Sequence, residues 1–170
     1  MQQDLFDLPP AHPPACAGGH RPAAYRVAIY RVALVREASF KMNRQRLRSS
    51  QDAADLFRQF LGAVDREYFV AVLLDRKNRL IGINTVSMGS LSASLVHPRE
   101  VYKPAILSNA AAIIVGHNHP SGDAQPSQED RSLTQRLVEA GKLLGIPVLD
   151  HVIVGDGTRS YFSFADRQLL

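Results

Sequence analysis

The amino-acid sequence predicts an α/β protein in which helices cover a mixed central β-sheet. Apolar runs of strand length alternate along the chain with amphipathic segments of helical length, an order typical of an α/β or α+β sandwich. Two of the runs are apolar throughout, as expected of strands buried on both faces. Hydrophobic residues make up 45% of the 170 residues, which is enough to build a sizeable core in one domain.

The folded domain is predicted to begin after a Pro-rich N-terminal segment. Residues 1–24 contain five prolines and few large apolar side chains, so they are predicted to be a disordered tail. Residues 25–170 are predicted to form the domain. Its first strand is expected at residues 25–35, which are rich in valine, isoleucine and tyrosine and alternate loosely.

The following segments are predicted to be one helix and three strands. Residues 50–64 carry apolar side chains at helical spacing after a start that contains serine and aspartate. Residues 68–74 are a continuous apolar run of strand length, a turn follows at 75–79, and residues 80–86 return as a second strand. Residues 90–96 are predicted to form a third, short strand.

Residues 98–109 are predicted to be helical but not continuous. Pro104 would clash with the carbonyl four residues back inside a regular helix, so a short first turn followed by a second helix from Pro104 is expected. Residues 111–115 then form another buried strand, which runs directly into His117.

The strongest helix pattern in the chain covers residues 127–144. Four apolar side chains share one face of it, and Gly145 ends it at a position where glycine is favoured. The four are Leu133, Leu137, Ala140 and Leu144. Strands at 147–154 and 160–164 complete the predicted domain.

Composition and charge restrict the classes of function. The single cysteine, Cys16, excludes a disulfide framework within the chain and fits a reducing compartment. No apolar run approaches the ~18 residues of a membrane helix and no signal-peptide pattern opens the chain, so a soluble cytoplasmic protein without a membrane partner is predicted. The net charge of +4 is compatible with nucleic-acid binding, although the basic residues 41–48 are interpreted as a solvated loop rather than a phosphate-binding patch.

The stretch GHNHPSGDAQPSQED, residues 116–130, has two interpretations. Ser127 followed three residues later by Asp130, ahead of an apolar-periodic run, fits a helix capping box, and an acidic first turn complements the helix dipole. Pro126 and Gly122 fit turn chemistry. On this interpretation Ser127 and Asp130 need no function.

The two histidines favour a metal site instead. His117 and His119 are two residues apart, so in an extended segment both side chains point to the same face. Together with Asp130 they make a set of three ligands, which leaves a fourth tetrahedral position open, as a catalytic zinc requires. Two histidines and a carboxylate also suit non-haem iron.

This pattern resembles the signature of the JAMM/MPN (JAB) metalloprotease family, and the wider match resembles its RadC-like branch. The resemblance covers residues 25 to the C-terminus. Its carriers are His97-Pro98-Arg99-Glu100, His117-Asn118-His119-Pro120-Ser121-Gly122-Asp123, Pro126-Ser127-x-Glu129-Asp130 and Leu149-Asp150-His151.

The resemblance implies a cytidine-deaminase-like α/β/α sandwich with a mixed central sheet and one Zn²⁺ ion per chain. It implies that His117, His119 and Asp130 are the metal ligands, with water as the fourth. It implies that Ser127 stabilises the oxyanion of a tetrahedral intermediate. The implied activity is that of a zinc-dependent hydrolase, which cleaves peptide or isopeptide bonds with a metal-activated water.

The general base is expected to be a glutamate. In the family it lies ahead of the first core strand, which favours Glu67 here; Glu100 is the alternative because it is closer in sequence to the histidines. For the pair Asp150 and His151 two alternatives stay open. Asp150 could orient a histidine, or His151 could be a structural residue at the start of a strand. His97 is interpreted as structural.

Two other functions stay open. The RadC-like branch is associated with DNA repair, so the alternative is a DNA-associated protein that binds or processes nucleic acid with little or no peptidase activity. Longer RadC-like chains carry a helix-hairpin-helix region, and residues 1–24 are too short to form one. The second alternative is a scaffold protein that keeps the fold but catalyses no reaction. The resemblance does not identify the peptide or protein substrate.

Overall fold

The computed structural model describes residues 27–42, 46–62, 64–89, 96–157 and 159–170. Contacts divide the chain after Val32, and the compact unit Ala33–Leu170 contains the helices and strands described here. The predicted tail at 1–24 lies outside the described residues, as does all but the last residue of the strand predicted at 90–96, so both remain predictions. Within the described residues, no helix has the length and apolar character that a membrane crossing needs.

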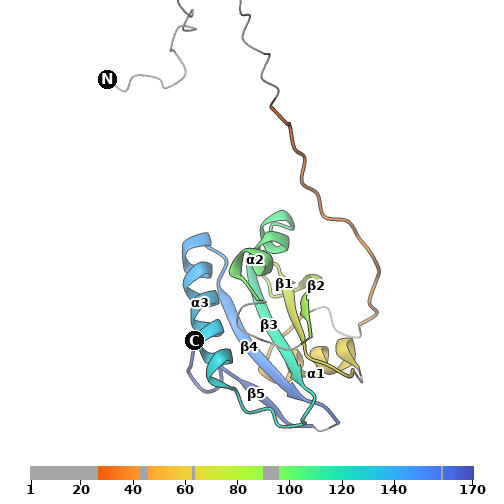
Figure 1. The fold of residues 1–170 in the computed structure, drawn as a ribbon, viewed down its shortest axis with the longest axis vertical. Coiled ribbons are helices and arrows are strands. Elements are labelled where there is room, and N and C mark those ends of the chain that lie inside the picture. Colours follow the sequence, from red (N-terminus) through yellow and green to blue (C-terminus); the bar gives the residue numbers. More distant parts are fainter. Residues whose placement is uncertain (1–26, 43–45, 63, 90–95, 158) are drawn as a thin grey trace, which may run out of the picture. The chain divides into compact units, whose positions relative to one another are not determined.

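Within the residues that the structure describes, three helices and five strands follow one another in the order α1, β1, β2, α2, β3, α3, β4, β5 (Figure 1). Their bounds are α1 Ser50–Leu61, β1 Tyr68–Leu74, β2 Leu80–Met88, α2 Pro98–Leu107, β3 Ala112–His119, α3 Gln128–Leu144, β4 Val148–Gly155 and β5 Tyr161–Ser163.

The five strands form one mixed sheet in the order β2-β1-β3-β4-β5. β1 pairs antiparallel with β2 and with β3, β4 pairs antiparallel with β5, and β3 and β4 are parallel. The helix α3 connects the two parallel strands, as parallel neighbours require a crossover. Their carboxyl ends therefore lie side by side at one edge of the sheet (Figure 1).

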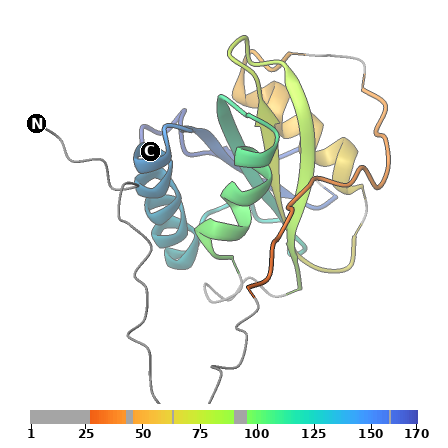
Figure 2. The ribbon, with the colours of Figure 1, turned by 90° about the horizontal axis from the view of Figure 1, so that it is seen from above.

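Helices cover both faces of the sheet, which confirms the predicted α/β/α sandwich (Figure 2). The side chains of β1 alternate between two buried clusters because successive residues of a strand point to opposite faces. Phe69 and Leu73 pack with α2 and α3, whereas Val70 and Val72 pack with α1. Apolar burial on both faces of β1 explains the continuous hydrophobic run in its sequence.

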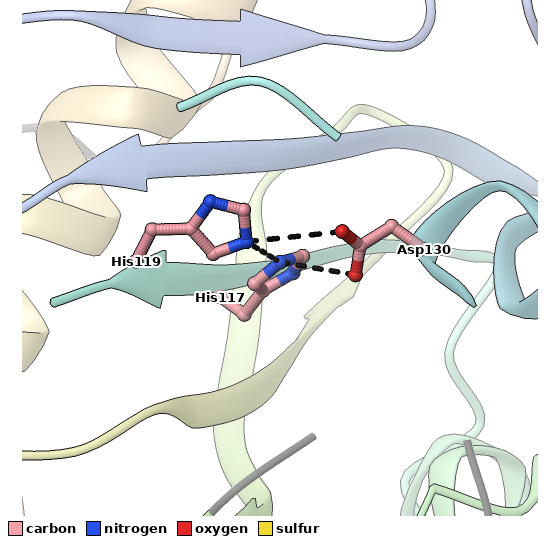
Figure 3. Close-up of side chains that lie close together, drawn as sticks. All are labelled: His117, His119 and Asp130. Atoms are coloured by element: carbon pink, nitrogen blue, oxygen red, sulfur yellow. Dashed lines mark hydrogen bonds and ion pairs between the residues drawn. The ribbon is translucent and has the colours of Figure 1, made fainter. Parts of the chain in front are cut away.

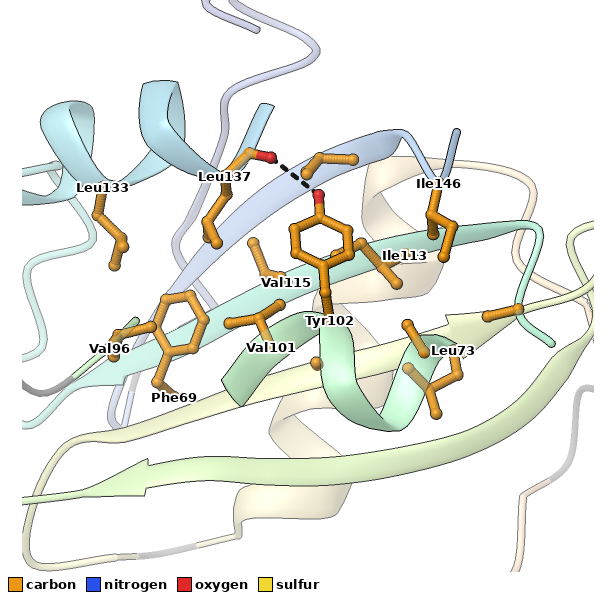
Figure 4. Close-up of a cluster of buried hydrophobic side chains, with 14 residues drawn as sticks. Phe69, Leu73, Val96, Val101, Tyr102, Ile113, Val115, Leu133, Leu137 and Ile146 are labelled. Carbon is orange, nitrogen blue, oxygen red and sulfur yellow. Dashed lines mark hydrogen bonds between the residues drawn. The ribbon is translucent and has the colours of Figure 1, made fainter. Parts of the chain in front are cut away.

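A buried tyrosine ties the two helices on one face together (Figure 4). The Tyr102 hydroxyl of α2 donates a hydrogen bond of 2.8 Å to the backbone carbonyl of Leu137 in α3. Burial raises the pKa of Tyr102 to about 12, so the hydroxyl keeps its proton. A Cβ atom at Gly141 would meet this hydroxyl and the carbonyl of Ile146, 2.7 Å away, which explains a glycine inside α3.

The strand predicted at residues 25–35 is wrong where the structure describes it. Residues 27–35 adopt no regular secondary structure, and their large apolar side chains are exposed. Valine and isoleucine favour a pleated surface but form a strand only where a neighbouring strand supplies hydrogen bonds. The pairings of β1 to β5 do not include these residues.

Two helix predictions also need correction. α2 is a single helix that runs through Pro104, which is buried, so the proline removes one backbone donor without dividing the helix. In α3, Leu144 of the predicted apolar face is 46% exposed. Gly145 adopts the left-handed conformation at φ 68° and turns the chain, and the buried Ile146 fills the core in place of Leu144.

Candidate metal centre

Strand β3 carries the two histidines to the edge of the sheet where it ends. His117 and His119 alternate with Asn118, so both lie on the face that α2 and α3 cover, in line with Val115. His117 is fully buried, and the His119 side chain is 15% exposed. The prediction that both histidines share one face is confirmed.

The turn after β3 brings Asp130 to the histidines. Gly122 adopts φ 82°, a conformation that favours glycine, and its N–H donates to the His119 carbonyl over 3.0 Å. The His119 ring contacts the Asp123 carbonyl through Nδ1 at 2.6 Å. Asp130 sits in the first turn of α3 and is buried, although it is acidic.

The three side chains converge on one point, as Figure 3 shows. His117 Nε2 lies 3.0 Å from His119 Nε2. Asp130 Oδ1 lies 3.3 Å from His117 Nε2, and Asp130 Oδ2 lies 3.7 Å from His119 Nε2. One ligand atom from each residue fits within 4.8 Å of the others.

The capping box is present in addition to this cluster. The backbone N–H and the hydroxyl of Ser127 both donate to Asp130 Oδ2, over 2.8 and 2.6 Å, and the Asp130 N–H donates to Ser127 Oγ. These bonds hold the carboxylate in one orientation, with Oδ1 directed at His117. The capping-box interpretation is therefore confirmed, and the same bonds orient Asp130 toward the histidines. The metal-site interpretation stays a prediction.

The donor set fits a divalent metal ion. Burial lowers the pKa of His117 to about 4, so its ring is neutral at neutral pH and offers a lone pair. Zinc–ligand distances of about 2.0–2.1 Å at tetrahedral angles place ligand atoms about 3.3 Å apart. The nitrogen–nitrogen and nitrogen–oxygen distances of 3.0 and 3.3 Å at His117 agree with that spacing.

Buried side chains surround His117. His117 Nδ1 lies 2.9 Å from His151 Nε2, and His151 Nδ1 lies 2.6 Å from the Thr134 hydroxyl. The His151 ring stacks on Phe164 with centroids 4.9 Å apart, and Phe69 contacts both imidazoles. Burial lowers the pKa of His151 well below its usual value.

The hypothesis that Asp150 orients a histidine finds no support in the contacts of its carboxylate. Asp150 accepts from the Ser163 hydroxyl at 2.7 Å and from the Ala165 N–H at 3.0 Å, so it anchors the C-terminal segment. Burial raises its pKa. Neighbouring residues of β4 point to opposite faces, which is why His151 reaches His117 and Asp150 does not.

Asn118 fixes the backbone on both sides of Glu67. Its side-chain oxygen accepts from the Tyr68 N–H at 2.8 Å, and its amide donates to the Arg66 carbonyl at 3.0 Å. The register of β1 and β3 pairs Phe69 with His117. Glu67 lies two residues before Phe69, just ahead of β1.

The alternative base, Glu100, has a different environment at the start of α2. Its carboxylate pairs with Lys103 Nζ at 2.7 Å and Arg99 Nε at 3.3 Å, and the hydrogen bond from Lys103 is the main cause of its lowered pKa. A lowered pKa makes a carboxylate a weaker base. His97 caps α2 by accepting from the Arg99 N–H through Nδ1, so its structural interpretation is confirmed.

Sequence reasoning missed Asn118 and Thr134 as parts of the site. A signal existed for Thr134, because it occupies a position between Leu133 and Leu137 on the stripe of α3 that faces the core. A polar residue in a core stripe needs a buried partner. For Asn118 the signal was its place in a buried strand, on the face opposite the two histidines.

Acidification is expected to destabilise the metal-free protein. In the folded state His117 has a pKa of about 4, whereas an unfolded histidine has a pKa near 6.5. On acidification the folded protein therefore binds this proton at a lower pH than the unfolded chain does. Between pH 6.5 and pH 4 the unfolded state binds more protons than the folded state. The free energy of unfolding should therefore fall by roughly 2–4 kcal/mol as the pH is lowered from 6.5 to 4. His151 acts in the same direction, since its pKa is lowered too.

Urea unfolding of chelator-treated protein at pH 7.5, 6.5, 5.5 and 4.5 measures this loss. The raised pKa of Asp150 acts in the opposite direction, because protonation of its carboxyl favours the folded state. A free energy of unfolding that stays constant or rises on acidification from pH 6.5 would contradict the buried, neutral histidines.

Comparison with known proteins places these residues in a family. The RadC-like JAB domain model matches residues 47–169. The UPF0758 protein of Moorella thermoacetica is 53% identical over 135 residues, 79% of this chain and 58% of that protein. The corresponding protein of Rubrobacter xylanophilus is 53% identical over 122 residues, 72% of this chain and 52% of its own length.

A UPF0758 protein of Clostridioides difficile is 46% identical over 135 residues, which cover 79% of this chain and 57% of that protein. The chain thus spans little more than half the length of these curated relatives. The matched region contains His117, His119 and Asp130, together with Asn118 and His151.

Proposed function

This chain belongs to the RadC-like JAB domain family, and on that basis we propose that it is a zinc-dependent hydrolase of the JAMM type. Its proposed reaction is the cleavage of peptide or isopeptide bonds, with one Zn²⁺ ion per chain. The observation that carries the proposal is the convergence of His117, His119 and Asp130, with ligand atoms within 4.8 Å of one another. This ligand set leaves a fourth position for water.

The three proposed ligands differ in their environments. His117 provides a buried neutral imidazole and Asp130 a carboxylate fixed by the helix cap, while the partly exposed His119 borders the solvent side. A zinc ion held there would lower the pKa of its water to roughly 7 and so supply hydroxide near neutral pH.

Glu67 is proposed as the general base. The base takes the proton of the attacking water and later passes it to the leaving amine. Asn118 holds the backbone at Arg66 and Tyr68, and this fixes where the Glu67 side chain begins. Glu100 is less suited to the role because Lys103 and Arg99 already pair with its carboxylate.

Ser127 is proposed to stabilise the oxyanion of the tetrahedral intermediate. Its hydroxyl donates to Asp130 Oδ2 in this structure, so it must turn toward the substrate to act. The backbone N–H of Ser127 also donates to Oδ2, which keeps the carboxylate oriented when the hydroxyl turns. Loss of such a donor typically lowers kcat on the order of 10²-fold or more.

The Glu67→Gln variant tests the proposal. We expect the variant to retain about one zinc per chain and to lose roughly 10²–10⁴ in kcat, because the amide cannot take a proton. The probe is a set of internally quenched peptides that contain either ordinary peptide bonds or isopeptide bonds to a lysine side chain. Metal content by mass spectrometry on untagged protein accompanies each assay.

Glu100→Gln is the matched control and should keep its activity. An active Glu67→Gln variant beside an inactive Glu100→Gln variant would move the base to Glu100. If the zinc-loaded wild-type protein cleaves neither kind of bond, the hydrolase proposal fails. The nucleic-acid-associated function or the scaffold without turnover would then be the better explanation of this domain.

A further inference from the structure

A continuous chain of contacts leads from His117 away from the proposed metal position. His117 Nδ1 contacts His151 Nε2 at 2.9 Å, and His151 Nδ1 contacts Thr134 Oγ1 at 2.6 Å. Thr134 Oγ1 in turn lies 2.6 Å from the backbone carbonyl of Asp130. His117 and His151 are fully buried and Thr134 is 2% exposed, so water does not compete for these contacts.

The carbonyl at the end of this chain sets the direction of each hydrogen bond. A carbonyl oxygen only accepts, so the single hydroxyl hydrogen of Thr134 points at Asp130. Thr134 Oγ1 can then only accept from His151, and the hydrogen of that contact belongs to His151 Nδ1. The backbone of α3 thereby specifies which nitrogen of His151 is protonated.

The same reasoning extends to His117. His151 is fully buried between the rings of Phe69 and Phe164, an apolar setting that favours the neutral imidazole. A neutral imidazole with its proton on Nδ1 accepts at Nε2, so His117 Nδ1–H is the donor of the contact between the rings. His117 Nε2 then carries a lone pair, and that atom faces His119 and Asp130.

We propose that Thr134 and His151 are positioning residues that hold His117 in the Nδ1–H tautomer, ready to bind a metal through Nε2. Asp130 acts twice in this arrangement. Its carboxylate is a proposed metal ligand, and its backbone carbonyl sets the tautomer of His117 through Thr134 and His151. Hydrogen bonds of this kind orient metal-binding histidines and typically change metal affinity 10–100-fold when they are removed.

A single hydrogen bond to a backbone carbonyl gives His119 the same tautomer. Its Nδ1 contacts the Asp123 carbonyl directly at 2.6 Å, so Nδ1 carries the hydrogen and Nε2 is free to bind. That carbonyl belongs to the turn between β3 and α3. His117, deeper in the sheet, lies beside β4 instead, and its partner is another side chain.

This inference rests on the proposed metal site, and its test does not depend on hydrolysis. Long-range ¹H–¹⁵N NMR spectra of ¹⁵N-labelled, chelator-treated protein distinguish protonated from unprotonated imidazole nitrogens. We expect His117 and His151 both to be protonated at Nδ1 and unprotonated at Nε2. A wild-type spectrum in which His117 is protonated at Nε2 would overturn the proposal, whatever the enzymatic activity.

A pair of Thr134 variants tests the relay by its chemistry. Thr134→Val keeps the shape and removes the hydroxyl, whereas Thr134→Ser keeps the hydroxyl. We expect Thr134→Val to shift His151 and His117 toward mixed tautomers and to weaken zinc binding about 10–100-fold, measured by competition with a chromophoric chelator. Thr134→Ser should retain the wild-type tautomers and a zinc affinity within about threefold.

Variants of His151 keep the test decisive if Thr134→Val does not fold. Glutamine at this position can accept from His117 and donate to Thr134, whereas leucine can do neither. His151→Gln should therefore preserve the Nδ1–H form of His117, and His151→Leu should lose it. The proposal is overturned if His117 has the same tautomer and zinc affinity in both, or if Thr134→Val matches wild type.

Discussion

The His119→Ala variant is expected to lose the stabilisation that zinc gives to the wild-type protein. A ligand that binds only the folded state at 1,000 times its Kd adds about 4 kcal/mol to the free energy of unfolding. Removing one of the three proposed ligands should reduce that gain to less than about 1 kcal/mol at the same zinc concentration. His119 is preferable to His117 for this test because its side chain is partly exposed at the end of β3.

Urea unfolding with and without added zinc, against a chelator baseline, measures the gain without any knowledge of the substrate. His97→Asn is the matched control, since it removes a histidine outside the cluster and asparagine still caps a helix. The control should respond to zinc as the wild type does. A His119→Ala variant with the full zinc response would exclude His119 as a ligand.

The Gly116→Ala variant is expected to have the largest effect on the stability of the fold. A Cβ atom at Gly116 would come 2.5 Å from Phe57 Cε2 and 2.6 Å from its Cζ. Phe57 is fully buried in the cluster of α1 and the sheet, so the ring has little freedom to move. Overpacking of this kind costs about 1–3 kcal/mol or more, and we expect the upper end of that range.

Gly82→Ala provides the control for this substitution, since a Cβ there would meet only Leu73 Cδ1 at an ordinary 3.8 Å. We expect its free energy of unfolding to stay within about 0.5 kcal/mol of wild type. Combining Gly116→Ala with Phe57→Leu should recover part of the loss, because the smaller side chain vacates the contact. Equal stability of the two glycine variants would contradict the close packing of α1 on β3.

The segment that carries the site was predictable because its signals are local. The periodicity and glycine signals of residues 111–145 depend on neighbours in sequence, and they correctly predicted a strand, a turn and a capped helix. The proposed ligand set followed from the strand alternation of His117 and His119 and the position of Asp130 at a helix start. The choice of zinc over iron entered through the family resemblance.

The contacts that support the site were not predictable, because they depend on the order of strands in the sheet. His151 meets His117 only because β4 lies parallel beside β3, and sequence patterns do not specify which strands are neighbours. The strand prediction for residues 27–35 was wrong for a related reason. Their strand-like composition does not indicate whether a partner strand is available.

The bonds between Ser127 and Asp130 have a kinetic consequence. The first turn of α3 and the orientation of the Asp130 carboxylate depend on the same three hydrogen bonds. Helix ends open locally far more often than whole domains unfold. Each opening of this turn would move the Asp130 carboxylate away from the proposed metal position, so we expect a stronger cap to slow the release of a bound ion.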